Sequence, residues 1–142
     1  MIPHHQEAVD TSRQLLQTTQ NPELIALASG IVMSQTTEIQ QMNEWLMWRY
    51  SGVVYQGMWY QPMMRSLSWL TTEQIDQQWT EDMIKHHQWA VDMANKVLEL
   101  LETNTTELSQ DQKNIIDSFA RTIIATQESE IQQMQTILDT YQ

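Results

Sequence analysis

The segment MIKHHQWAVDM, residues 83–93, decides how this chain folds, because a near-copy of it, MIPHHQEAVDT, occupies residues 1–11. All four histidines of the protein lie in these two copies, at the same place in each. A second repeated segment follows each copy, QTTEIQQM at residues 35–42 and QESEIQQM at residues 127–134. The chain is therefore a duplicated unit in which paired histidines precede a glutamine, a glutamate and a methionine.

Apolar residues recur at alternating steps of three and four along both repeats, which is the period of an α-helix. We expect four helices, over about residues 2–19, 22–50, 72–102 and 110–142. Capping residues for the last three helices are present at Asn21 with Pro22, Thr71 with Gln74, and Ser109 with Gln112.

The predicted fold is all-α, an up-down four-helix bundle built from two repeated helical hairpins. We expect a single domain over residues 1–142, with repeat one at 1–50, a linker at 51–71 and repeat two at 72–142. If the helices alternate in direction, both histidine pairs lie at one end of the bundle, beneath the linker. One short helical turn is expected in the linker near residues 63–69.

Composition excludes several classes of function. The net charge of −11 argues against nucleic-acid binding, which needs a basic face, but suits the attraction of cations. No apolar run approaches the ~18 residues of a transmembrane helix. No signal-peptide pattern is present, and the chain begins inside its own repeat motif, so we expect further residues upstream in the natural protein.

The chain has no cysteine but ten methionines. A thioether is a soft metal ligand that cannot form a disulfide, so methionine suits metal handling where thiols would oxidise. We therefore expect a periplasmic or extracellular protein.

Polar residues interrupt the apolar face of each predicted helix, and they need partners because an unpaired buried polar group costs about 1–3 kcal/mol. The turn of each hairpin lies midway between a histidine and a glutamate. Equal helical rise therefore places His5 opposite Glu38 and His87 opposite Glu130.

The same geometry places Met1 opposite Met42 and Met83 opposite Met134. Each hairpin is thus expected to gather two thioethers, an imidazole and a carboxylate. The other histidine of each pair, His4 or His86, lies about 100° round its helix. His86 can turn toward Met93, where the first copy has Thr11.

A thioether with an imidazole favours Cu(I), while an imidazole with a carboxylate also suits Cu(II) or Zn(II). Glu38 and Glu130 are candidates either as ligands or as partners that orient an imidazole N–H. The structural alternative is a buried Glu–His pair surrounded by core methionines.

Tryptophan and methionine crowd the end of the second predicted helix and the linker. These residues suit either a copper-collecting surface, because Trp faces attract cations, or a hydrophobic lid over the bundle. The candidate accessory metal residues are Met47, Met58, Met63 and Met64.

At HHQWAVDM, followed by QESEIQQM, the chain resembles the CopM-like copper-binding family, a bacterial, ferritin-like domain of unknown function marked by HHxxAVxMA. The resemblance covers both halves, outside residues 51–71. It implies a helical bundle that binds copper in the periplasm or outside the cell and protects against copper excess. Carried over by position, the implied metal residues are Met1, His4, His5, Glu38 and Met42, with Met83, His86, His87, Met93, Glu130 and Met134. Thr11 in place of Met93, and Pro3 in place of Lys85, predict sites of unequal affinity.

We therefore expect a protein that sequesters or buffers copper, preferentially as Cu(I) with Cu(II) as the alternative, and not an enzyme. A ferritin-like di-iron oxidase needs Glu-x-x-His motifs, and the sequence has none. A metal-free helical interaction protein is the structural alternative. No Ser/His/Asp pattern or phosphate-binding glycine loop indicates hydrolysis or nucleotide binding. A copper sensor or an efflux protein is the candidate protein partner.

Overall fold

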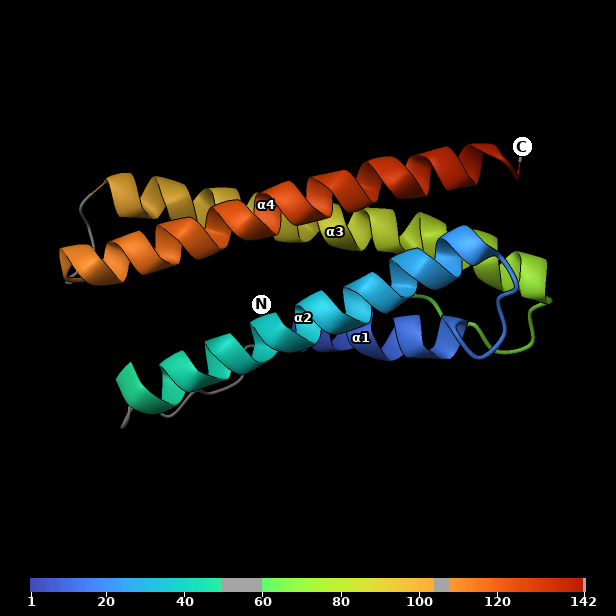
Figure 1. The fold of residues 1–142 in the computed structure, drawn as a ribbon, viewed down its shortest axis with the longest axis horizontal. Coiled ribbons are helices and arrows are strands. Elements are labelled where there is room, and N and C mark those ends of the chain that lie inside the picture. Colours follow the sequence, from blue (N-terminus) through green and yellow to red (C-terminus); the bar gives the residue numbers. More distant parts are fainter. Residues whose placement is uncertain (50–59, 104–107, 142) are drawn as a thin grey trace.

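The computed structural model describes residues 1–49, 60–103 and 108–141. This part of the chain forms helices α1 (Ile2–Leu15), α2 (Pro22–Arg49), α3 (Thr72–Glu102) and α4 (Gln110–Asp139). Helix α1 packs along α2, and α3 packs along α4, so the helices form two hairpins that lie against each other (Figure 1). The predicted all-α architecture of two hairpins is confirmed.

The predicted capping residues set the starts of three helices. Asn21 Oδ1 accepts hydrogen bonds from the amides of Glu23 (2.9 Å) and Leu24 (3.4 Å), at the start of α2. Thr71 and Ser109 each form a complete capping box with the glutamine three residues later. The starts of α2, α3 and α4 were therefore predictable from local sequence alone.

The short helical turn expected near residues 63–69 is absent, and the segment is irregular, with Trp69 at a positive φ of 68°. Side chains of α3 form hydrogen bonds with backbone groups that would be paired within the segment if it were helical. The Arg65 amide donates to Asp82 (3.0 Å), and the Ser66 carbonyl accepts from Gln78 (3.0 Å). Leu67 is buried and anchors the segment to the apolar core.

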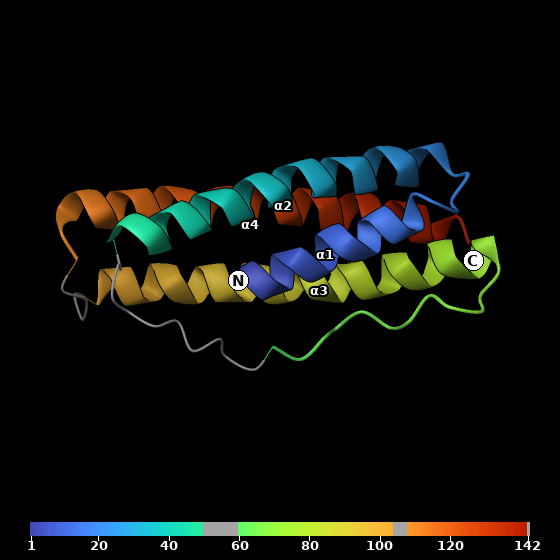
Figure 2. The same cartoon turned by 90° about the horizontal axis from the view of Figure 1, so that it is seen from below.

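The expected alternation of helix directions is wrong, because α2 and α3 run the same way (Figures 1 and 2). Helix α4 runs antiparallel to α2: Asn21 contacts Tyr141 at one end, and Trp45 contacts Phe119 at the other. An extended linker of about 20 residues reaches over ~60 Å, so it can span a 31-residue helix, which is about 46 Å long. Its described part passes alongside α3 (Figure 2).

The core consists of two apolar clusters separated by polar side chains. The larger cluster includes Leu15, Leu24 and Trp79, and the smaller is built on Ala90, Ala94, Ala120 and Ile123. Between them lies a set of residues that we call the polar belt: His4, His5, Gln35, Glu38, His86, His87, Gln127 and Glu130. The four histidines therefore gather as expected, but in the middle of the bundle and not at its end.

Asn21 both caps α2 and donates a hydrogen bond to Tyr141 Oη at the end of α4 (3.1 Å). Replacing it with Ala removes both bonds, so we expect the free energy of unfolding to fall by about 1–2 kcal/mol. Chemical denaturation monitored by circular dichroism measures this change. Asn43→Ala, at an exposed position within α2, is the matched control and should change stability by less than about 0.5 kcal/mol. Equal effects of the two substitutions would contradict this role of Asn21.

Candidate metal centre

Each hairpin brings a buried histidine against a glutamate of the neighbouring helix. His5 Nε2 lies 2.7 Å from Glu38 Oε2, and His87 Nε2 lies 2.7 Å from Glu130 Oε2. The second pair is aligned as a hydrogen bond, whereas the first is at contact distance without that alignment. The pairings expected from helical rise are therefore present in both repeats.

The remaining histidines meet across the contact between α1 and α3. The rings of His4 and His86 stack with their centroids 3.5 Å apart and their planes 21° from parallel. His4 also stacks on Trp89, with the ring centroids 4.6 Å apart. The two repeats thus share one histidine cluster instead of holding two separate pairs.

The surroundings of the four rings indicate which nitrogen carries the proton. Every Nε2 faces an oxygen: the His86 carbonyl for His4 (3.0 Å), Glu7 for His86 (3.3 Å), and Glu38 or Glu130 for the others. Every Nδ1 is buried and has no hydrogen-bond partner among the described residues. In a neutral ring the proton therefore belongs on Nε2, and the Nδ1 lone pair is free to bind a cation.

Burial keeps part of this cluster uncharged. Desolvation, followed by the neighbouring histidines His86 and His5, lowers the pKa of His4 from 6.5 to about 2. Desolvation, with His87 and His5, lowers the pKa of His86 to about 3. Both rings are neutral at physiological pH, which is the form that binds metals.

Three of the candidate methionines line one cavity of about 310 Å³. Met1 lies one helical turn before His5, and Met42 lies one turn after Glu38, as the sequence predicts for repeat one. Met93 comes from α3 and joins them, although the expectation grouped it with repeat two. The antiparallel crossing of α1 and α3 explains this, since it brings the later part of α3 beside the start of α1.

The two methionines expected for repeat two, Met83 and Met134, are completely buried within the larger apolar cluster. They lie one turn from His87 and from Glu130 in sequence, as expected. Their neighbours in the cluster are aliphatic or aromatic side chains, which is the setting of core methionines.

The proposed accessory methionines do not form one surface. Met47 is 66% exposed on α2, and Met58 lies outside the described residues. Met63 and Met64 are half-buried, and Met64 packs against the larger apolar cluster. This packing of Met64 is the contact expected of a hydrophobic lid, and the choice between a lid and a copper-collecting surface stays a prediction.

Glu7 and Tyr60 were missed by the sequence interpretation. The Glu7 carboxylate accepts hydrogen bonds from the Tyr60 hydroxyl and from the amides of Met63 (3.0 Å) and Met64 (3.2 Å). Burial, and then Glu7, raise the pKa of Tyr60 above its usual value. We call the set of Glu7, Tyr60, Met63 and Met64 the linker clasp. The sequence does mark Glu7 through a difference between the two copies, because the second copy has Trp89 at the matching position.

Within the described residues, no three His, Cys, Asp or Glu side chains are grouped to hold one metal ion. None of the helices in residues 1–49, 60–103 and 108–141 combines the length and apolar character needed to cross a bilayer.

Comparison with known proteins places this geometry in a family. Residues 1–138 match the domain of unknown function DUF305. CopM in its Cu(II)-bound form superposes with a TM-score of 0.76 and 31% identity, over 100% of this chain and 93% of CopM. CopM has also been solved in Cu(I)-bound and Ag-bound forms.

Two further relatives come from Streptomyces coelicolor and from a mimivirus. A putative secreted DUF305 protein from Streptomyces coelicolor has a TM-score of 0.76 and 26% identity, covering 99% of this chain and 86% of that one. The uncharacterised protein L153 of Acanthamoeba polyphaga mimivirus is 42% identical over 43 residues. That match spans 30% of this chain and only 28% of the viral protein.

The lowered pKa values of His4 and His86 predict how stability depends on pH. The unfolded chain takes up protons near pH 6.5 that the folded protein refuses until about pH 2–3, so stability is lost as the pH falls below 6.5. Denaturation at pH 7 and pH 5 should show wild type losing about 2 kcal/mol or more beyond the loss of His4→Gln/His86→Gln. Equal losses in the two proteins would contradict burial of these rings in neutral form.

Proposed function

This chain belongs to the DUF305 family, and we propose that it binds copper, preferentially as Cu(I), and sequesters or buffers the metal in copper resistance and homeostasis. The proposal concerns a binding protein and not an enzyme. It is consistent with the sequence, which lacks the Glu-x-x-His motifs of di-iron oxidases.

One observation carries the proposal. The thioethers of Met1, Met42 and Met93 line a single cavity. Along the chain, Met1 lies one helical turn from His5, and Met42 lies one turn from Glu38. Neutral sulfur and nitrogen donors favour Cu(I) over hard cations such as Mg²⁺ and Ca²⁺. The chain offers no thiolate that would compete for the ion.

The histidine geometry supports the same function. Glu38 and Glu130 hold the Nε2 side of His5 and His87, an arrangement that orients an imidazole and raises its basicity toward a metal. We therefore propose Nδ1 as the donor atom and the glutamates as orienting partners, with Cu(II) or Zn(II) able to bind the carboxylates directly.

The relatives support copper in particular. CopM, with the same fold over the whole chain, has been solved with Cu(I), Cu(II) and silver bound. Silver(I) is a soft monovalent ion with the ligand preferences of Cu(I). We propose a periplasmic or extracellular location from the secreted Streptomyces relative and the absence of cysteine, with a copper sensor or efflux protein as the partner.

Replacing Met42 and Met93 together with Leu tests the thioether cavity. Leu roughly preserves volume and apolarity, so the fold should lose less than about 1.5 kcal/mol per exchange. Cu(I) affinity, measured by competition with a colorimetric chelator under anaerobic conditions, should fall by at least about tenfold, or 1.4 kcal/mol.

Met83→Leu/Met134→Leu is the matched control, since it removes two sulfurs that lie in the apolar cluster. This variant should keep the wild-type Cu(I) affinity within about twofold. If the control loses Cu(I) binding and the cavity variant does not, the site is the one expected in repeat two. If wild type retains no copper after desalting, the proposed function is wrong.

A further inference from the structure

The cavity that Met1, Met42 and Met93 share, the thioether cavity, has an apolar wall. Every described side chain that lines it belongs to Met, Ile, Leu, Val, Ala, Trp or Phe. An ion in this cavity therefore meets no carboxylate from the described lining side chains. The attraction for its charge must come from neutral groups.

Two aromatic rings, those of Trp45 and Phe119, are part of the same wall. The face of an aromatic ring carries a negative electrostatic potential, and the ring of Trp attracts cations more strongly than that of Phe or Tyr. Besides the three sulfurs, these rings are the described lining side chains that attract a cation. Trp45 is the stronger of the two.

Trp45 is placed to reach an ion held by Met42. It lies three residues after Met42 on α2, so the two side chains share one face of the helix, with Cβ atoms about 5–6 Å apart. A cation is attracted to an aromatic ring within about 6 Å of the ring centroid. An ion bound to the Met42 sulfur is therefore within reach of the indole without a change in the backbone.

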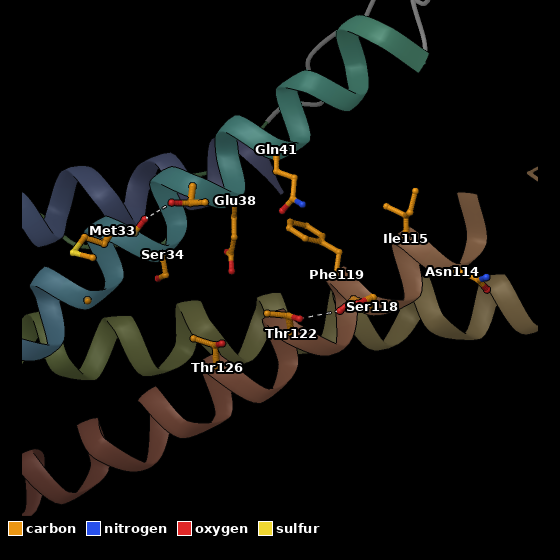
Figure 3. Close-up of a pocket in the computed structure, with 12 residues that line it drawn as sticks. Met33, Ser34, Glu38, Gln41, Asn114, Ile115, Ser118, Phe119, Thr122 and Thr126 are labelled. Atoms are coloured by element: carbon orange, nitrogen blue, oxygen red, sulfur yellow. Dashed lines mark hydrogen bonds between the residues drawn. The ribbon is translucent and has the colours of Figure 1, made fainter. Parts of the chain in front are cut away.

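A contact between the hairpins holds the indole in the wall. The rings of Trp45 and Phe119 meet edge to face, with centroids 4.8 Å apart and planes 73° from parallel. Figure 3 shows the Phe119 ring extending from α4 toward α2. Edge-to-face pairs are favourable arrangements of aromatic rings, so this contact limits rotation of the indole. The ring is therefore in place before an ion binds.

The second repeat has neither the cavity nor the indole. Ile137 occupies the position that matches Trp45, and it is buried in the larger apolar cluster together with Met83 and Met134. Trp45 is instead half-buried beside the cavity. The aromatic ring thus accompanies the methionine that lines a cavity, and the aliphatic side chain accompanies the methionines of the core.

We propose that Trp45 is a further binding residue for Cu(I), whose indole ring covers the bound ion in a cation–π contact beside the three thioethers. This inference rests on the proposed function, since it adds a residue to the same site. The ring attracts the charge and its apolar surface displaces water from one side of the ion. A monovalent ion suits such a site, because the Born cost of burying an ion rises with the square of its charge.

The test uses the full chain and two soft ions. Ag(I) is titrated in chloride-free buffer, and Cu(I) is measured by anaerobic competition with a colorimetric chelator. Affinity for both ions should fall by about threefold in Trp45→Phe and by about tenfold in Trp45→Leu, because Phe has a weaker ring potential and Leu has none. Melting temperatures confirm folding, and Trp45→Phe serves if Trp45→Leu is unfolded.

The indole absorption and fluorescence provide a readout that packing alone would not change. Ag(I) should perturb both in wild type, and the perturbation should be lost in Trp45→Phe. Trp69→Phe is the control, because Trp69 is fully exposed and absent from the described lining of the cavity. It should keep the wild-type affinity and the perturbation.

Ile116→Ala is the control for packing, because Ile116 lines the same cavity without a ring. Its affinity for Ag(I) should stay within about twofold of wild type. Unchanged affinity in the folded Trp45 variants would overturn the inference, and so would a perturbation that survives in Trp45→Phe. A loss in Ile116→Ala as large as in Trp45→Leu would reduce Trp45 to a packing residue. A wild-type protein that binds neither Ag(I) nor Cu(I) would instead refute the proposed function itself.

Discussion

The main constraint on this bundle is a layer of polar side chains, the polar belt, that lies buried between two apolar clusters. A buried donor or acceptor without a partner costs about 1–3 kcal/mol, and the belt contains several. The side-chain amides of Gln35 and Gln127 and all four histidine Nδ1 atoms have no hydrogen-bond partner within the described residues. Apolar side chains would stabilise the same positions better, and yet both repeats carry the belt. Under the proposed function, the Nδ1 atoms without a hydrogen-bond partner are the atoms that bind the metal.

The two repeats form one asymmetric histidine cluster because of how the hairpins meet. The stacking of His4 on His86 couples repeat one directly to repeat two. The antiparallel crossing of α1 and α3 then brings Met93 to Met1 and Met42. The residue at the matching position of repeat one is Thr11, which has no sulfur. Glu7 holds the linker, whereas Trp89, its counterpart, stacks on His4. The repeats therefore carry the same His, Glu and Met residues, and single differences between the copies give these residues different environments.

Local physics made most of the fold and part of the site predictable. Helical period and capping chemistry located α2, α3 and α4 closely, and equal rise from each turn paired His5 with Glu38 and His87 with Glu130. The direction of the second hairpin was not predictable, because a linker of about 20 residues permits either arrangement. The grouping of Met93 and the clasp of Glu7 with Tyr60 depend on that direction. Neither contact could therefore be predicted from the residue spacing within one hairpin.

Under the proposed function, the selection of copper depends on donors that carry no charge. Carboxylates such as Glu38 and Glu130 are hard, charged groups that attract any cation without distinguishing copper. The sulfurs of Met1, Met42 and Met93 and the neutral imidazoles are uncharged, so they favour an ion only through soft or borderline coordination. A hard dication bound to the thioethers loses water and gains no oxygen ligand from them. A soft ion forms strong bonds to sulfur, so these bonds offset more of the free energy that it loses with its water. This difference is the basis of the expected preference for Cu(I).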